Sequence, residues 1–349
     1  MKKWYNTTDT YIWLFNVGRG LSVFIRTPNN HGILYDLGAS ADFSPIEFME
    51  KNIFPHIKDY KISGTNTSHK VAQLILSHPH LDHIFEVDNI KKIGIAYITC
   101  PHDKDEIEGI DFDRIGNHDK VTSYKELYAK RNLPLQTIQY SSQQVTAIQA
   151  EYGIYYIRPT VVTDLHLEND HHYGNGCSIV FYYQYGPNSI LIPGDITPEA
   201  FEYLLKESDG SEKRYSIFSY ESKFKDWHSK TSNQPSLISK LKTYGLTILV
   251  PPHHGLESCF SEFLFSNIKG NKPRLNIISE KRTGETEGKV DARYQSKNGS
   301  FGMNVSFEDK IEERNSITTK DGNHYLIKFT NDKRVEVFGA KNPELLLNK

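Results

Sequence analysis

Residues 74–85 have the sequence LILSHPHLDHIF, in which a short apolar run leads directly into three histidines and an aspartate. Polar side chains at the end of a buried strand cost free energy unless they are paired. Residues two apart in an extended chain point the same way, so His78 and His80 can bind one cation. Asp82 and His83 lie where the next helix starts and can face a second cation. Imidazole and carboxylate groups suit zinc and other first-row metals.

The same change from apolar to ligand-type residues ends three further runs that we expect to be strands. GILYDLG reaches Asp36, SILIPGD reaches Asp195, and LTILVPPHHG reaches His253 and His254. Short continuous apolar runs are typical of strands buried in a sheet. If the four strand ends face one edge of two packed sheets, their polar side chains meet there. The sequence therefore predicts a metal site at that edge.

The composition predicts a folded protein that crosses no membrane. Hydrophobic residues make up 38% and charged residues 24% of the chain, which favours a packed core over disorder. The formal net charge of −2 neither predicts nor excludes nucleic-acid binding, because a local groove can be basic on a neutral protein. The three cysteines form no CxxC pair, which favours a reducing compartment. Without a signal-like start or a long apolar run, we expect a cytoplasmic protein.

We expect one domain over residues 1–349, with insertions at about 102–150 and 207–234. Both insertions are polar and, apart from a helical stretch in the first, lack a clear hydrophobic period. Elsewhere strands alternate with helices. The predicted elements include a strand over 153–162 and helices over 44–54, 84–94 and 197–207.

The HxHxDH pattern after a strand resembles the motif of the metallo-β-lactamase superfamily. Within this superfamily, segments of the chain resemble the soluble domain of the DNA-uptake protein ComEC: FNVGRGLSVFI, GILYDLG, NGCSIVFYYQYGPNSILIPGD, LVPPHHG and ITTKDGNHYLIKF. The resemblance extends over nearly the whole chain and leaves out only the two insertions. The ordered series of motifs is specific to the superfamily.

The resemblance implies an α/β protein, namely an αββα sandwich of two mixed β-sheets flanked by helices, with metals at one edge. It implies two divalent ions, Zn or Mn. The implied ligands are His78 and His80 for the first ion, Asp82, His83 and a histidine of PPHHG for the second, and Asp195 as a bridge between both. Asp36 is implied to orient a loop that carries ligands.

Two ligand positions leave alternatives open. In PPHHG the resemblance favours His253 as the ligand, because related His-x-Gly sequences bind through that first histidine. His254 then lies behind the ligands or donates a proton to the leaving group. Many superfamily members also supply a further histidine to the first metal, before the bridging aspartate. Here His171 or His172 in ENDHHYGNGCS can fill that role, and without either the first site is weaker and partly filled.

The resemblance implies a metal-dependent hydrolase, with a phosphodiesterase or nuclease that uses a metal-bridging hydroxide as the leading hypothesis. Asp82, Asp195 and His254 are the expected catalytic groups. Lys281 and Arg282 in SEKRTG either contact the phosphate or belong to a solvated loop.

Two other functions stay open at this point. One is a hydrolase of a small-molecule phosphoester, thioester or lactam, and the other is a metal-binding or sensing subunit without turnover. Nucleic acid is the expected substrate under the leading hypothesis, and Trp227 either stacks on a base or anchors the second insertion. A protein partner at 207–234 is compatible with the sequence, and no membrane contact is expected.

Overall fold

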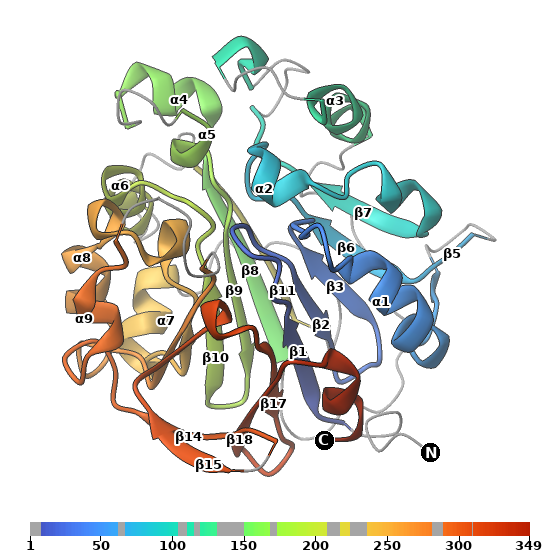
Figure 1. The fold of residues 1–349 in the computed structure, drawn as a ribbon. Helices are drawn as coiled ribbons and strands as arrows, with labels where there is room; N and C mark the ends of the chain where they lie inside the picture. The colour runs from blue at the N-terminus through green and yellow to red at the C-terminus, as the bar shows by residue number, and fades with distance from the viewer. Residues whose placement is uncertain are drawn as a thin grey trace.

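Two large β-sheets pack face to face (Figure 1). The computed structural model describes residues 8–61, 67–103, 110–114, 119–130, 150–167, 173–207, 217–223, 236–280, 289–308 and 310–349. The first sheet has nine strands in the order β15 (Ile311–Arg314), β14 (Met303–Ser306), β18 (Val335–Ala340), β17 (His324–Phe329), β1 (Thr10–Leu14), β2 (Val23–Arg26), β3 (Gly32–Tyr35), β6 (Val71–Ile75) and β7 (Ile95–Thr99). The second has seven in the order β11 (Ile217–Lys223), β8 (Ala150–Ile157), β9 (Val180–Tyr185), β10 (Asn188–Ile192), β12 (Ile248–Leu249), β13 (Leu275–Ile278) and β16 (Ser316–Thr318). A separate pair is formed by β4 (Tyr60–Lys61) and β5 (Ser68–His69).

Both large sheets are mixed, and helices lie outside them. In the first sheet β3, β6 and β7 run parallel, and in the second β10, β12, β13 and β16 do so, next to antiparallel pairs. The α-helices are α1 (Pro45–Asn52), α2 (Leu81–Ile84), α3 (Val121–Ala129), α4 (Pro159–Asp164), α5 (Tyr173–Gly176), α6 (Pro198–Glu207), α7 (Leu237–Tyr244), α8 (Glu262–Asn267) and α9 (Ala292–Gln295). Short 3-10 turns are η2 (Phe54–His56), η3 (Asn89–Lys92), η4 (Phe112–Arg114), η5 (Pro252–Gly255), η6 (Glu257–Cys259), η7 (Thr319–Asp321) and η8 (Pro343–Asn348). In Figure 1, α1 lies beside the first sheet and α6 to α9 beside the second. Among the described residues, no helix combines the length and the apolar character that crossing a membrane requires.

The hydrophobic core has one layer between the sheets and others under the helices. Ile12 and Leu14 of β1 pack between the sheets, whereas Trp13 points to the opposite face, in the cluster that contains Met49 of α1. This alternation follows from the two-residue period of a strand. Across the sheets, Tyr35 donates a hydrogen bond to the carbonyl of Ile179 at 2.6 Å. The architecture is an αββα sandwich of two mixed sheets flanked by helices, which confirms the predicted fold class.

Two of the predicted helices form where their capping residues place them. Helix α1 starts after Ser44, whose hydroxyl accepts a hydrogen bond from the backbone N–H of Glu47 at 3.1 Å. Helix α6 starts after Thr197, whose hydroxyl accepts from the N–H of Ala200 at 3.2 Å. Both are the side-chain caps that serine and threonine provide at helix starts.

Two other predicted elements differ from the structure. The helix predicted over 84–94 is only the short α2 and the turn η3, because the N–H of Glu86 donates to the carbonyl of Leu37 instead of to its own helix. The strand predicted over 153–162 ends at Ile157, and α4 follows it with Pro159 at its start. Proline is favoured at the first helical position because its missing N–H is not needed there.

The two predicted insertions are described only in part. In the first, 102–150, the described residues include η4 and helix α3. In the second, residues 217–223 form the edge strand β11, which pairs antiparallel with β8 from Ile217–Ile157 to Lys223–Glu151. Most of the rest of 207–234, including Trp227, lies outside the described residues.

His31, just before β3, couples the stability of the fold to pH. The residue is 8% exposed. Burial, together with the charges of Lys58 and Arg26, lowers the pKa of its imidazole from 6.5 to about 3. Between these two values the unfolded chain binds a proton that the folded chain does not bind. The stabilisation is therefore complete above pH 6.5 and is lost as the pH falls towards 3.

We expect His31→Leu to reduce the acid sensitivity of folding. At pH 4.5 the protonation of His31 in the unfolded state destabilises the wild type by about 3 kcal/mol relative to pH 7.5, and the variant lacks this contribution. Urea denaturation at both pH values measures the free energies of unfolding. If the free energy of unfolding fell equally in the wild type and in the variant between pH 7.5 and pH 4.5, His31 would not be the source of the acid sensitivity. Circular dichroism at pH 7.5 controls for folding of the variant.

Candidate metal centre

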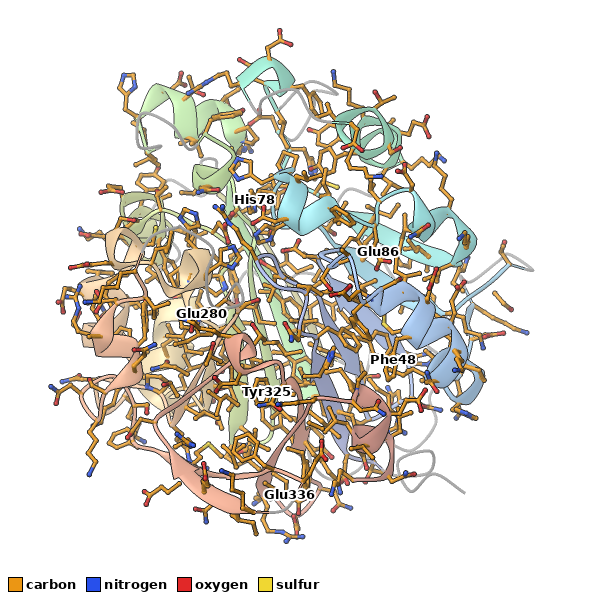
Figure 2. All side chains as sticks on the ribbon, viewed as in Figure 1. Phe48, His78, Glu86, Glu280, Tyr325 and Glu336 are labelled. Atoms are coloured by element: carbon orange, nitrogen blue, oxygen red, sulfur yellow. The ribbon has the colours of Figure 1, made fainter. Side chains whose placement is uncertain are left out.

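The ends of four strands bring the predicted polar residues to one edge of the sandwich. In the first sheet, β3 leads to Asp36 and β6 leads to His78. In the second sheet, β10 leads to Asp195 and β12 leads to His253. Figure 2 labels His78 close to α2, and the hydrogen bonds and ion pairs below connect all four loops. The edge predicted from the sequence thus exists as a cluster of side chains.

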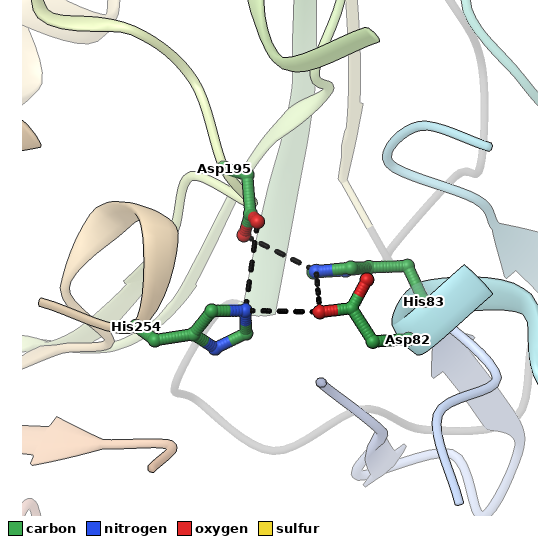
Figure 3. A group of neighbouring side chains, drawn as sticks. All are labelled: Asp82, His83, Asp195 and His254. Atoms are coloured by element: carbon green, nitrogen blue, oxygen red, sulfur yellow. Dashed lines mark ion pairs between the residues drawn. The ribbon is translucent and has the colours of Figure 1, made fainter. Parts of the chain in front are cut away.

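Four residues form a compact group that could hold a metal ion (Figure 3). Ligand atoms of Asp82, His83, Asp195 and His254 all lie within 4.8 Å of one another. His254 Nε2 is 3.4 Å from Asp82 Oδ2 and 3.5 Å from Asp195 Oδ2. His83 Nε2 is 3.2 Å from Asp195 Oδ1 and 4.0 Å from Asp82 Oδ2. The two histidines and Asp195 are buried, and the side chain of Asp82 is 23% exposed.

The spacing of these atoms fits a metal better than it fits direct hydrogen bonds. Ligands on a tetrahedral zinc with bonds of about 2.0–2.1 Å are separated by roughly 3.3 Å. The inward atoms Asp82 Oδ2, His83 Nε2, His254 Nε2 and His78 Nε2 are buried without a hydrogen-bond partner. Buried polar atoms in proteins nearly always have one. A cation shared by Asp82, His83 and His254 would satisfy three of these atoms, so the residues of the group fit a metal ion.

The carboxylates and imidazoles of the group shift each other's pKa values. Burial lowers the pKa of His254, but the negative charges of Asp195 and Asp82 outweigh it and raise the value to about 9. The pKa of His83 is likewise raised well above 6.5, because Asp195, Asp36 and Asp82 outweigh its burial. Burial raises the pKa of Asp195, yet His83 and His254 hold it well below its usual range. Without metal, the group is therefore a cluster of ion pairs.

Asp36 holds the ring of His83 from behind. Its Oδ2 accepts from His83 Nδ1 at 2.7 Å and from the hydroxyl of Ser77 at 2.7 Å, and its Oδ1 accepts from the N–H of Ser77 at 2.6 Å. Asp36 and His83 are fully buried. Carboxylates that accept from the second nitrogen of a metal-binding imidazole fix its tautomer and orientation. The position corresponds to the orienting role that the resemblance implies.

The predicted first pair, His78 and His80, lies next to this group. Their ring centroids are 4.5 Å apart, and His78 Nε2 is 3.9 Å from Asp195 Oδ2. The hydroxyls of Ser77 and Ser178 contact His78 Nδ1 at 3.0 and 3.2 Å, which leaves Nε2 facing the centre. Burial lowers the pKa of His80 to about 4, so it is neutral at pH 7, as a ligand must be.

PPHHG places both of its histidines at the centre. His254 belongs to the four-residue group, whereas the sequence favoured His253 for that position. His253 Nε2 lies 3.7 Å from Asp195 Oδ2, and its Nδ1 lies 3.1 Å from the sulfur of Cys259. Both histidines have left-handed backbone, with φ values of 47° and 57°. Such angles are uncommon outside glycine and tend to occur at functional sites.

Arg19 lies at the rim of the centre, and sequence reasoning did not select it. Its Nε is 3.3 Å from Asp82 Oδ2, and its side chain is 32% exposed. The loop that carries it packs on Asp82, since a Cβ on Gly20 would lie 2.1 Å from the carbonyl oxygen of Asp82. The hydroxyl of Ser279 also donates to the carbonyl of Gly20 at 2.5 Å. The two glycines of NVGRG were the available signal, because they indicate a tight loop.

Four of the predicted functional residues fall outside the described part of the chain. They are His171, His172, Lys281 and Arg282. Their roles stay predictions.

Comparisons with known proteins give only distant likenesses. No family model matches the chain. No curated protein matches it either. Among solved structures, the chain is similar to CmlA, a diiron β-hydroxylase from Streptomyces venezuelae, with 11% identity, a TM-score of 0.35, and coverage of 77% of this chain and 44% of that one. A mutant of the CmlA β-hydroxylase gives 12% identity, a TM-score of 0.33, and coverage of 75% and 38%.

The chain thus spans less than half the length of these solved chains. At such TM-scores the likeness carries no information about the chemistry of the site. None of the comparisons singles out the ComEC group.

We expect Asp36→Asn to weaken metal binding without unfolding the protein. Both oxygens of Asp36 accept hydrogen bonds, so an asparagine amide must turn its NH2 towards a donor and release the ring of His83. Loss of such a contact lowers metal affinity by about 10–100-fold. Isothermal titration with Zn²⁺ or Mn²⁺ measures the effect.

Asp291→Asn is the matched control, because Asp291 is also a buried carboxylate but caps α9. Its affinity should equal that of the wild type. An unchanged affinity in Asp36→Asn would show that the orientation of His83 does not depend on Asp36.

Proposed function

We propose that the chain is a metal-dependent phosphodiesterase and that nucleic acid is its substrate. The observation that carries this proposal is a guanidinium beside a metal-binding group, with Arg19 Nε 3.3 Å from Asp82 Oδ2. Arginine presents planar donors that match the oxygens of a phosphate. A neutral lactam or thioester offers no such anionic partner. The resemblance to the ComEC group also supports a nuclease.

In this proposal some residues of the centre bind the metal ions, and others orient the metal ligands or the substrate. Bound divalent cations, for which we propose Zn²⁺ or Mn²⁺, supply Lewis-acid chemistry by lowering the pKa of a water and offsetting charge on a phosphoryl oxygen. Asp82, His83 and His254 would hold one ion, His78 and His80 the other, and Asp195 would contact both. Asp36 and Ser77 keep the imidazoles in place, and Arg19 orients the phosphodiester.

His254 acts as a ligand in this proposal. Its Nε2 faces Asp82 and Asp195, so it is not directed at a leaving group. Phosphate contacts by Lys281 and Arg282, and a protein partner at 207–234, are compatible with the proposal and stay predictions.

We expect Asp82→Ala to abolish phosphodiester hydrolysis. The wild type should bind about two metal ions per chain, and the variant about one, because Asp82 is a ligand of one ion only. Turnover of bis-p-nitrophenyl phosphate should fall by about 100-fold or more. Mass spectrometry of the dialysed proteins gives the metal content, and absorbance gives the turnover.

Incubation with single- and double-stranded DNA and RNA, in Mn²⁺ or Zn²⁺, tests the substrate. Cleavage by the wild type and not by Asp82→Ala supports a nuclease. Intact nucleic acids alongside turnover of the small phosphodiester would favour a small-molecule hydrolase. A metal-loaded protein that cleaves neither would favour a binding or sensing subunit.

We expect Arg19→Ala to raise the KM for bis-p-nitrophenyl phosphate by about tenfold, which corresponds to roughly 1.4 kcal/mol of lost binding. Its kcat and metal content should change little, because Arg19 binds no metal. The KM of Arg19→Lys should lie between the values of the wild type and Arg19→Ala, since lysine keeps the charge but loses the planar donors.

The neutral ester p-nitrophenyl acetate serves as the control substrate. If Arg19 contacts the negatively charged substrate directly, Arg19→Ala should leave any turnover of this neutral ester unchanged. An equal loss on both substrates would assign Arg19 to the support of Asp82 instead.

A further inference from the structure

We propose that the outer face of α2 binds an unpaired base beside the phosphate that is cleaved, with Phe85 as the stacking ring and Leu81 as its apolar neighbour. The substrate is then single-stranded nucleic acid. This inference rests on the proposed function and specifies its substrate further. It concerns side chains that point away from the metal ligands.

The short helix α2 turns two different faces to its surroundings. His83 and Ile84 are buried, whereas Leu81 is 38% and Phe85 42% exposed. The side chain of Asp82 is 23% exposed. Phe85 keeps helical backbone angles, with φ of −54° and ψ of −38°, so it lies three and four residues after Asp82 and Leu81 on the same helical turn. Residues at these spacings are neighbours, with Cβ atoms about 5–6 Å apart. Leu81, Asp82 and Phe85 therefore share one outer face.

The exposure of two large apolar side chains on one helical turn is unusual in this protein. In the part of the chain that the structure describes, the other exposed large apolar side chains lie singly along the sequence: Leu165, Tyr244, Phe301, Ile311 and Leu345. Single exposed apolar residues are common and need no explanation, whereas grouped ones mark binding surfaces. The pair on α2 adjoins a candidate metal ligand, which indicates that it contacts a substrate.

The charge next to the pair indicates which substrate fits. Arg19 Nε lies 3.3 Å from Asp82 Oδ2, and the Arg19 side chain is 32% exposed. A phosphate held by this guanidinium and the metal group lies on one side of Asp82, and Phe85 lies on the other side of it. Nucleic acid strands present anionic phosphates and flat bases in alternation, and proteins bind them with basic groups and aromatic rings together. An apolar peptide would leave the guanidinium without a partner.

Contacts on both sides of α2 fix the ring before a ligand arrives. The N–H of Glu86, the next residue, donates to the carbonyl of Leu37 at 2.9 Å. On the side of α3, Lys120 Nζ lies 6.0 Å from the centroid of the Phe85 ring and 2.6 Å from Asp88 Oδ2. In Figure 1, α2 and α3 lie at the same end of the molecule. A ring that is already positioned loses less conformational entropy on binding.

Stacking on Phe85 distinguishes single strands from duplexes. A base in a duplex is covered by its neighbours and must leave the stack before a side chain can contact its face. An unpaired base offers its face directly, and every base has one, so no strong sequence preference is expected. The wild type should therefore bind single-stranded DNA more tightly than the duplex, and Phe85→Ala should reduce this difference.

The test compares two oligonucleotides of equal length and charge, one of thymidines and one without bases. Both carry phosphorothioate linkages, which slow hydrolysis, and fluorescence anisotropy measures their binding to the metal-loaded, full-length protein. We expect Phe85→Ala to weaken binding of the oligothymidylate by about tenfold and to leave the abasic strand unchanged. Phe85→Trp should keep the wild-type affinity, because its ring also stacks. Leu81→Ala should cause a smaller loss on the oligothymidylate alone.

Two further variants serve as references. Arg19→Ala should weaken the binding of both oligonucleotides, because Arg19 contacts the phosphate that they share. Phe301→Ala is the matched control, since Phe301 is 54% exposed and has Lys272 Nζ at 4.7 Å from its ring centroid. Phe301 precedes β14, which lies at the opposite end of the molecule from α2 in Figure 1. Its loss should change neither affinity.

Several outcomes would overturn the inference. An equal loss on both oligonucleotides in Phe85→Ala would assign the ring to the support of Asp82, and an unchanged affinity for the oligothymidylate would exclude stacking. A dimer in light scattering that Phe85→Ala dissociates would assign the outer face of α2 to a second copy of the chain. A wild type that binds neither strand would refute the proposed function together with the inference. Base-dependent binding without cleavage of ordinary DNA or RNA would refute the proposed function alone.

Discussion

The carboxylate of Asp195 is the point on which the metal centre depends. It is 3% exposed, and a buried charge is stable only when opposite charges or hydrogen bonds compensate it. His83 approaches Oδ1 at 3.2 Å, while His254, His253 and His78 surround Oδ2 at 3.5, 3.7 and 3.9 Å. His78 and His83 follow β6 of the first sheet, and His253 and His254 follow β12 of the second. The packing of the sheets against each other therefore sets the geometry of the site.

Three of the imidazoles are positioned by different groups behind them. The partners are Asp36 for His83, the hydroxyls of Ser77 and Ser178 for His78, and the sulfur of Cys259 for His253. Because every one of these contacts uses Nδ1, the Nε2 atoms all point to the same space. Ser178 also accepts a hydrogen bond from the N–H of Asp195 at 3.2 Å, so Asp195 and the imidazole of His78 share a support. The centre is thus preorganised by contacts that lie outside it.

The sequence predicted the parts of this arrangement that depend on local polarity. An apolar strand that ends in Asp36, His78 or Asp195 is visible in a few residues, and the edge they form follows from the fold class. The placement of His254 in the four-residue group and of His253 against Cys259 was not visible, because it depends on two left-handed backbone angles that histidine rarely adopts. Arg19 was missed for a related reason: its contact with Asp82 exists because Gly20 lets a distant loop approach that residue closely. The placement of the two histidines and the position of Arg19 both depend on tertiary contacts, which the local sequence does not show.

The electrostatics of the centre connect metal binding to protons. Asp82 and Asp195 are held in the charged form, and His83 and His254 have raised pKa values because those carboxylates face them. Without metal, two positive and two negative side chains balance within the group. A divalent cation can enter only by displacing the protons of the histidines, and it then provides the positive charge that they supplied. The carboxylates are neutralised in either state, which explains how a buried acidic centre and a stable sandwich can coexist. Asp195 can thus serve as a connection between the sheets while its buried charge stays compensated.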